Sequence, residues 1–122
     1  MPKKILLVIA LLYTIALAVL SLLSSGNLPD LEVDYADKVA HLIAYGVLYF
    51  VWQITLDAYK IPKAILIASG FAITYGIILE VLQGTLTVGR TLDMYDVLAN
   101  CIGVVIILIV YKYKNKTHVK NL

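Results

Sequence analysis

Ionisable and amide side chains recur at helical spacing within three apolar stretches of this sequence. In the first, Asp37, His41 and Tyr45 follow one another every four residues. Residues three or four positions apart lie on one face of an α-helix, so these side chains form a stripe along one helix. A carboxylate, an imidazole and a phenol in such a stripe can transfer protons or bind a polar ligand. Lys38 lies on another face, from which we expect it to extend to the lipid headgroups.

The other two stretches repeat this arrangement. Gly76, Glu80 and Gln83 are spaced four and three apart, and the glycine permits a neighbouring helix to approach closely. The last stripe has spacings of three, four and three, and consists of Asp93, Asp96, Asn100 and Gly103. The three stripes are predicted to end at the same face of one helical bundle.

The elements that carry these stripes are predicted to be membrane-spanning helices. Hydrophobic residues make up 61% of the 122 residues, charged residues only 15%, and the mean hydropathy is +0.90. A soluble domain is about 45–50% apolar, so the excess must face lipid. About 20 apolar residues cross a bilayer. The sequence therefore predicts an all-α, polytopic bundle and a single domain over residues 1–122, with four transmembrane helices at about 5–23, 37–56, 62–83 and 93–111.

The first apolar stretch follows Lys3 and Lys4, a pattern that a secretory signal peptide would share. At 19 residues it is longer than the apolar core of a typical signal peptide, and no small-x-small cleavage site follows it. We expect it to be a retained helix.

Basic residues predict how the bundle is oriented. Lys38 and Arg90 lie on one predicted side of the membrane, and eight lysines lie on the other: Lys3, Lys4, Lys60, Lys63, Lys112, Lys114, Lys116 and Lys120. Because cytoplasmic segments carry the excess of Lys and Arg, both termini should be cytoplasmic and the three stripes should open outward. We expect a multi-pass protein of the plasma membrane. The net charge of +2 gives no indication of nucleic-acid binding.

Ionisable side chains at membrane depth should face the bundle interior, because each costs roughly 2.5–3.5 kcal/mol there. Glu80 is the clearest case, and Arg90, His41 and Lys38 are its candidate partners. A hydrogen-bond network that only fixes the helix register would explain part of this pattern. The number of polar groups exceeds what four helices need for association, which favours a function. By contrast, Asp30, Glu32 and Asp34 fall in a predicted loop and are expected to be solvated.

The motifs in residues 30–105 resemble those of the VanZ-like family of small membrane proteins. The first motif is Asp37, Lys38, His41 and Tyr45; the second is Glu80 and Gln83; the third is Arg90, Asp93, Asp96, Asn100 and Gly103. The resemblance implies a multi-helix membrane fold. The founding member is associated with lowered susceptibility to the glycopeptide antibiotic teicoplanin, so the resemblance also implies a bacterial cell-envelope context. This chain has little outside the shared core, and the resemblance implies no defined molecular activity.

Binding at an outward-facing polar pocket is the first functional prediction. Arg90, Lys38 and His41 would contact an anionic headgroup, pyrophosphate or glycan, while the acidic and amide groups would position these cations. A membrane lipid, a lipid-linked cell-wall precursor or a lipophilic glycopeptide fits this chemistry. The residues expected to line the pocket are Asp37, Lys38, His41, Tyr45, Glu80, Gln83, Arg90, Asp93, Asp96 and Asn100.

Two alternatives stay open at the level of sequence. An intramembrane enzyme acting on a lipid headgroup would use Glu80 and His41 as acid and base, with Arg90 stabilising negative charge. A small transporter is the other, although the polar stripes stop near the outer half of the bundle. A metal-dependent variant of this enzyme is open, because His41 with Asp37, Glu80, Asp93 and Asp96 supplies enough oxygen-rich ligands. One His and no Cys at the site make zinc a weak prediction, so we expect no cofactor and no metal. The sequence does not indicate an oligomeric state.

Overall fold

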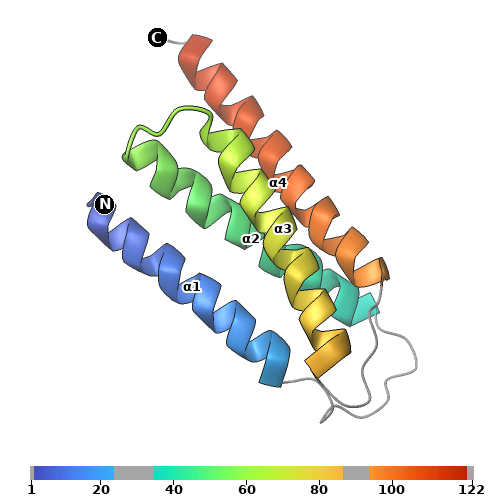
Figure 1. The fold of residues 1–122 in the computed structure, drawn as a ribbon. Coiled ribbons are helices and arrows are strands. Elements are labelled where there is room, and N and C mark those ends of the chain that lie inside the picture. Colours follow the sequence, from blue (N-terminus) through green and yellow to red (C-terminus); the bar gives the residue numbers. More distant parts are fainter. Residues whose placement is uncertain (1, 24–34, 87–93, 121–122) are drawn as a thin grey trace.

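A computed structural model of the protein describes residues 2–23, 35–86 and 94–120. These residues form four α-helices and no strand: α1 (Lys3–Leu23), α2 (Tyr35–Ala58), α3 (Ala64–Leu86) and α4 (Met94–Lys120) (Figure 1). Each helix is long and apolar enough to cross a membrane. The prediction of an all-α, four-helix membrane protein is confirmed.

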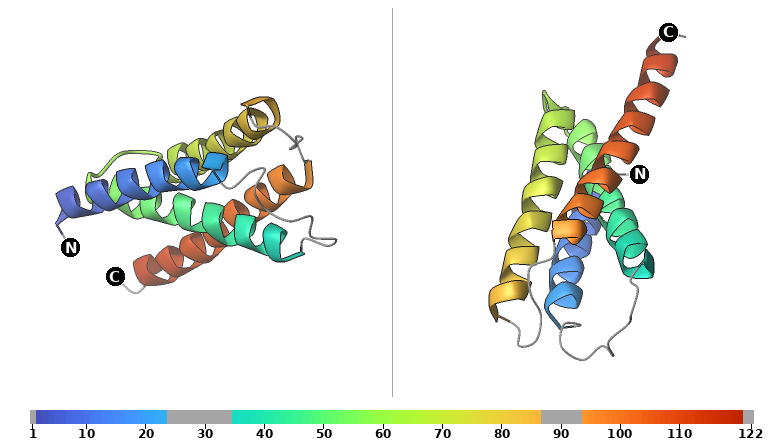
Figure 2. Two further views of the ribbon diagram at one scale, coloured as in Figure 1. Left: turned by 90° about the horizontal axis from the view of Figure 1, so that it is seen from below. Right: turned by 90° about the vertical axis from the view of Figure 1, so that its right-hand side faces the viewer.

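The helices run up and down in turn, so both chain termini lie at one end of the bundle (Figures 1 and 2). We call this the termini end. The opposite end, where α1 and α3 finish and α2 and α4 begin, is the distal end. Four crossings place both termini on the same side of a membrane. That this side is the cytoplasm stays a prediction from the lysine distribution.

The surface of the bundle is apolar, as a lipid-facing surface must be. Leu20, Leu66 and Ile109 are each more than half exposed. The buried core, formed by α2, α3 and α4, consists of Tyr45, Leu48, Tyr49, Ala68, Ala72, Leu79 and Val104. Large apolar residues therefore cover the lipid-facing surface, and the small residues Ala68 and Ala72 share the core with larger ones such as Tyr49.

Helices α2 and α4 approach most closely at two glycines. A Cβ atom at Gly103 would overlap the backbone carbonyl of Leu42, and a Cβ at Gly46 would lie 2.9 Å from Cγ1 of Ile107. Any side chain at Gly103 would therefore push the two backbones apart. Small residues at such crossings let transmembrane helices pack by dispersion contacts, since lipid provides no hydrophobic drive for association.

Helix α1 has few buried residues and is held to the bundle by hydrogen bonds. The Tyr13 hydroxyl donates to the carbonyl oxygen of Ala44 (2.6 Å), and the indole Nε1 of Trp52 donates to Oγ1 of Thr14 (2.8 Å). The hydroxyl of Tyr75 donates to the Thr14 carbonyl (2.6 Å). These bonds come from both α2 and α3, so α1 packs as an integral part of the bundle.

The turn between α2 and α3 caps the C-terminal end of α2. Lys60 has a φ of 58°, its N–H donates to the carbonyl of Asp57 (3.0 Å), and the Ile61 N–H donates to the carbonyl of Leu56 (3.0 Å). This is the Schellman arrangement, with a lysine at the left-handed position that glycine usually fills.

Helix α4 continues to Lys120, whereas its apolar stretch predicted an end near residue 111. No Gly or Pro follows Tyr111, and lysine is a good helix former. The backbone therefore stays helical beyond the apolar segment.

Candidate functional site

Four polar side chains from three helices meet near the distal end. Lys38 and His41 come from α2, Glu80 from α3 and Asp96 from α4; together we call them the distal cluster. Nε2 of His41 lies 3.3 Å from Oε1 of Glu80 and 3.9 Å from Oδ2 of Asp96. Nζ of Lys38 lies 2.5 Å from Oδ1 of Asp96. The side chains of three sequence stripes therefore converge, as their spacing predicted.

The prediction for Lys38 was wrong in one respect. We expected its side chain to extend to the headgroups, but its ammonium group pairs with Asp96. The close packing of α2 on α4 brings position 38 to face α4. A buried carboxylate is costly at membrane depth unless a cation accompanies it, so the lysine stays within the bundle.

Burial differs between the two halves of the distal cluster. The side chains of Glu80 and Asp96 are each 4% exposed, whereas those of His41 and Lys38 are 16% and 28% exposed. The groups able to carry positive charge thus lie at the accessible rim, and the carboxylates lie behind them.

A second polar layer lies one helical turn closer to the membrane centre. It consists of Tyr45, Gly76 and Asn100, each one turn from a member of the distal cluster. A Cβ at Gly76 would lie 2.9 Å from Nδ2 of Asn100 and 3.1 Å from Cε1 of Tyr45. Asn100 is 1% exposed, and its amide nitrogen and oxygen have no hydrogen-bond partner within the described part of the chain. The predicted role of Gly76, to admit a close neighbour, agrees with this packing.

Helix α1 contributes to the site through Ser21. Nε2 of Gln83, a buried residue on α3, donates to the Ser21 backbone carbonyl (2.5 Å). Gln83 belongs to the predicted site, so α1 packs beside that site. The sequence stripes gave no indication of this contact, because Ser21 lies in a helix without a polar stripe.

Several predicted site residues lie outside the part of the chain whose side chains are described. Asp37 lies in the first turn of α2, but its side chain is not among those described. Arg90 and Asp93 precede α4 and fall outside the described residues, as do the predicted loop acids at positions 30, 32 and 34. The proposed contact between Arg90 and Glu80 is therefore untested.

A second polar network extends toward the termini end, where the sequence predicted none. The Tyr49 hydroxyl donates to Oε1 of Gln53 (2.7 Å), and Nε2 of Gln53 donates to Oδ1 of Asp57 (3.1 Å). The hydroxyl of Tyr111 on α4 donates to the other Asp57 oxygen. The expectation that polar side chains stop in the outer half was therefore wrong. The four-residue repeat of α2 in fact continues from Tyr45 through these positions, and this continuation was the missed signal.

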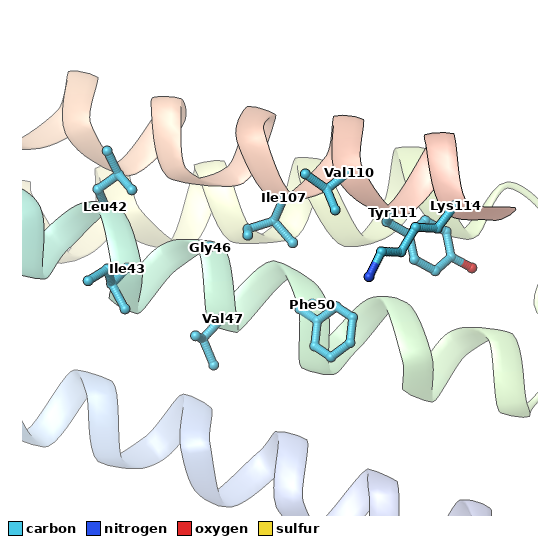
Figure 3. A pocket seen from close by; sticks show the side chains of 9 residues that line it. All are labelled: Leu42, Ile43, Gly46, Val47, Phe50, Ile107, Val110, Tyr111 and Lys114. Atoms are coloured by element: carbon cyan, nitrogen blue, oxygen red, sulfur yellow. The ribbon is translucent and has the colours of Figure 1, made fainter. Parts of the chain in front are cut away.

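An apolar groove with a volume of about 400 Å³ runs along the seam between α2 and α4 (Figure 3). Its lining residues are Leu42, Ile43, Gly46, Val47, Phe50, Ile107, Val110, Tyr111 and Lys114. Leu42 lies one helical turn after Lys38, so the groove begins just below the distal cluster. Lys114 lies at the opposite end of the groove (Figure 3). The groove faces the lipid and could accommodate a hydrocarbon chain.

A family model described as VanZ/LLP1 matches residues 5–115 of the chain. This chain belongs to the VanZ/LLP1 family. The match spans most of the protein, including most of each helix and the whole distal cluster, and it confirms the family resemblance of the sequence motifs. Comparisons with curated proteins and with solved structures gave no match. The chain is thus a multi-pass VanZ/LLP1 membrane protein.

The distal cluster of this VanZ/LLP1 protein also has the composition of a metal-binding site. One ligand atom each from His41, Glu80 and Asp96 can be chosen so that all three lie within 4.8 Å of one another. The expectation of no metal rested on the weakness of a zinc site with one His and no Cys, although the sequence also offers oxygen ligands beside His41. One imidazole and two carboxylates are also a suitable set for divalent ions that prefer oxygen ligands.

Proposed function

We propose that this protein binds the polar headgroup of an envelope lipid, or of a lipid-linked cell-wall precursor, at the distal cluster. The observation that carries this proposal is the position of Lys38 and His41 at the accessible rim of the cluster, each beside a buried carboxylate. Glu80 and Asp96 hold the two rim groups in place. An ammonium and an imidazole held in this way are suited to contact phosphate or hydroxyl oxygens.

Helix association alone does not account for this arrangement. A few hydrogen bonds suffice to fix transmembrane helices, and the bonds described for Tyr13, Trp52 and Tyr75 hold α1 with neutral donors and acceptors. The distal cluster instead buries two carboxylates, which are far more costly than hydroxyls at membrane depth. The use of costly groups at one end of the bundle favours a ligand there.

The groove between α2 and α4 supports a ligand that is a lipid. It begins one turn from Lys38 and is lined mainly by apolar side chains that face the membrane. A headgroup at the distal cluster could therefore place an acyl or prenyl chain along Val47 and Phe50. A single amphipathic molecule would then satisfy both surfaces.

The proposal places the site in the outer leaflet of the plasma membrane. The lysine distribution puts the termini end in the cytoplasm, so the distal end faces outward. Asp37, Arg90 and Asp93, which the family motifs contain, are proposed to line the same site from its outer edge. The outer leaflet is where lipid-linked wall precursors and glycopeptide antibiotics meet.

The contact between His41 and Glu80 favours a second candidate function, that of an intramembrane enzyme. Nε2 of His41 lies 3.3 Å from Oε1 of Glu80, close enough for a shared proton. Such a pair can act as general base and general acid during attack of water on a headgroup. In this alternative the same ligand binds, but it leaves as a product.

Incubation of the purified protein with extracted envelope lipids tests both functions. Mass spectrometry of the bound fraction should identify one lipid class enriched by the wild type and lost from the Glu80→Gln and His41→Ala variants. Asp57→Asn is the matched control, because it removes a carboxylate at the termini end. If none of the lipid classes is enriched, the binding function is wrong. If a cleaved headgroup accumulates with the wild type but not with these variants, the protein is an enzyme rather than a binding protein.

A role in teicoplanin susceptibility is a separate part of the proposal. If the bound lipid is the precursor that glycopeptides recognise, production of the protein in a sensitive host should raise the inhibitory concentration of teicoplanin. The Glu80→Gln variant, produced at the same level, should not. Equal inhibitory concentrations for wild type and empty vector would exclude this role in that host.

A further inference from the structure

We propose that His41, Glu80 and Asp96 bind one divalent cation, such as Mn²⁺, and that this ion contacts the phosphate of the bound headgroup. The second half of this statement rests on the proposed function. The first half concerns only the three side chains and stands without it.

The three ligand atoms lie within 4.8 Å of one another, so they need to move closer together to bind one ion. Ligand atoms around one ion at about 2.0–2.2 Å lie roughly 3–3.5 Å from one another. Nε2 of His41 is already 3.3 Å from Oε1 of Glu80 and 3.9 Å from Oδ2 of Asp96. The ligands come from three different helices, so the bundle itself holds them together. Small side-chain rotations would bring all three oxygen and nitrogen atoms onto one ion.

The charge of the described distal cluster also favours a cation. With a neutral imidazole, Lys38 contributes one positive charge against the two negative charges of Glu80 and Asp96. A divalent ion beside these side chains would add to the positive charge that Lys38 offers to an anionic headgroup.

Asn100 gives an independent indication of a polar ligand in this region. It lies one turn from Asp96 on α4 and is 1% exposed, yet its amide oxygen and nitrogen have no partner among the described residues. A buried amide without partners costs about 1–3 kcal/mol, so such groups normally contact water, an ion or a ligand. Water molecules completing the coordination of an ion at Asp96 would provide these partners.

Lys38 has a supporting role in this site. Its ammonium group contacts Oδ1 of Asp96, while Oδ2 is the oxygen nearer to His41. The lysine therefore orients the carboxylate so that one oxygen is directed toward the proposed ion. Hydrogen bonds of this kind fix the geometry of metal ligands in many sites. Three protein ligands leave further coordination positions for water or phosphate oxygens.

Titration of the purified full-length protein with Mn²⁺ tests the metal site. Electron paramagnetic resonance measures the unbound ion, and we expect one Mn²⁺ to bind per chain. Glu80→Gln and Asp96→Asn should each weaken binding at least tenfold, whereas the control Asp57→Asn should bind as the wild type does. The midpoint of thermal unfolding should rise with Mn²⁺ in the wild type and in the control only. Absence of saturable binding of both Mn²⁺ and Zn²⁺, or binding unchanged by Glu80→Gln, would overturn the proposal.

A second experiment separates the metal site from the lipid function. Vesicles containing either a polyprenyl pyrophosphate or phosphatidylglycerol are offered to the protein with Mn²⁺ or with EDTA. We expect the protein to retain one of these phosphate lipids when Mn²⁺ is present, and to retain at least tenfold less of it in EDTA. Comparison of the two vesicle types shows which phosphate lipid the protein prefers. Lipid retention that is equal in EDTA would overturn the bridging role of the ion and leave the lipid function standing. Mn²⁺ binding without retention of either lipid would instead contradict the lipid half alone.

Discussion

Nζ of Lys38 on α2 lies 2.5 Å from Oδ1 of Asp96 on α4, although 58 positions separate the two residues. The pair joins the beginnings of two helices whose backbones meet at Gly46 and Gly103. Two roles are therefore combined in one contact: it holds α2 to α4, and it orients a carboxylate toward His41. Substitutions can separate these roles.

Asp96→Asn should lower the free energy of unfolding in detergent by about 1–3 kcal/mol, because it removes the carboxylate that lies 2.5 Å from Nζ of Lys38. The double variant with Lys38→Met and Asp96→Leu should recover most of this loss, since an apolar pair removes both charges. Denaturant unfolding followed by circular dichroism measures the change. A double variant less stable than Asp96→Asn would show that the ion pair does not set stability. Even a stable double variant should lose Mn²⁺ binding.

Gly76→Ala should destabilise the bundle by about 1–3 kcal/mol, because its Cβ would lie 2.9 Å from Nδ2 of Asn100 and 3.1 Å from Cε1 of Tyr45. Gly70→Ala on the same helix is the matched control. A Cβ at Gly70 meets nothing within 4 Å, so alanine there should add up to about 1 kcal/mol through helix propensity. Thermal unfolding in detergent compares the two. Equal midpoints would mean that α3 shifts to make room at position 76.

Hydropathy and spacing predicted the helices and most of the distal cluster. Glu80 was expected to meet Arg90, His41 or Lys38, and the structure places His41 beside it. Helical spacing brings polar side chains onto one face, and the cost of burying charge directs that face inward, so both steps follow from the sequence. The pairing of Lys38 with Asp96 did not follow, because it depends on how closely α2 approaches α4.

Contacts with α1 were also beyond prediction from the sequence. They use backbone carbonyls and single hydroxyls, such as the Ser21 carbonyl that accepts from Gln83. Every residue has a backbone carbonyl, so no residue pattern marks which one accepts. The network from Tyr49 to Asp57 is different, because the four-residue repeat of α2 did contain that signal.

Thr14→Val should detach one of the bonds that hold α1. The Trp52 indole would lose its acceptor. Because a transmembrane hydrogen bond contributes about 0.6 kcal/mol on average, the free energy of unfolding should fall by about 0.5–1 kcal/mol. Trp52 is the only tryptophan, so its fluorescence should shift to shorter wavelength as the N–H loses its partner. Ser69→Ala is the control, since that hydroxyl bonds within its own helix to the carbonyl of Ile65. An unchanged emission maximum in Thr14→Val would contradict the contact.

Tyr111→Phe tests whether the network at the termini end joins α2 to α4. It removes the hydroxyl that donates to Asp57 and should lower the free energy of unfolding by about 1 kcal/mol. Tyr59→Phe is the matched control, because it keeps the ring that lies 5.0 Å from Nζ of Lys3 and should change stability little. A double-mutant cycle with Asp57→Asn isolates the contact. If the two substitutions are additive, Tyr111 and Asp57 are not coupled. A coupling energy of about 0.5 kcal/mol or more would show that the contact stabilises helix packing. If the same variants bind Mn²⁺ and lipid as the wild type does, this network has no part in ligand binding.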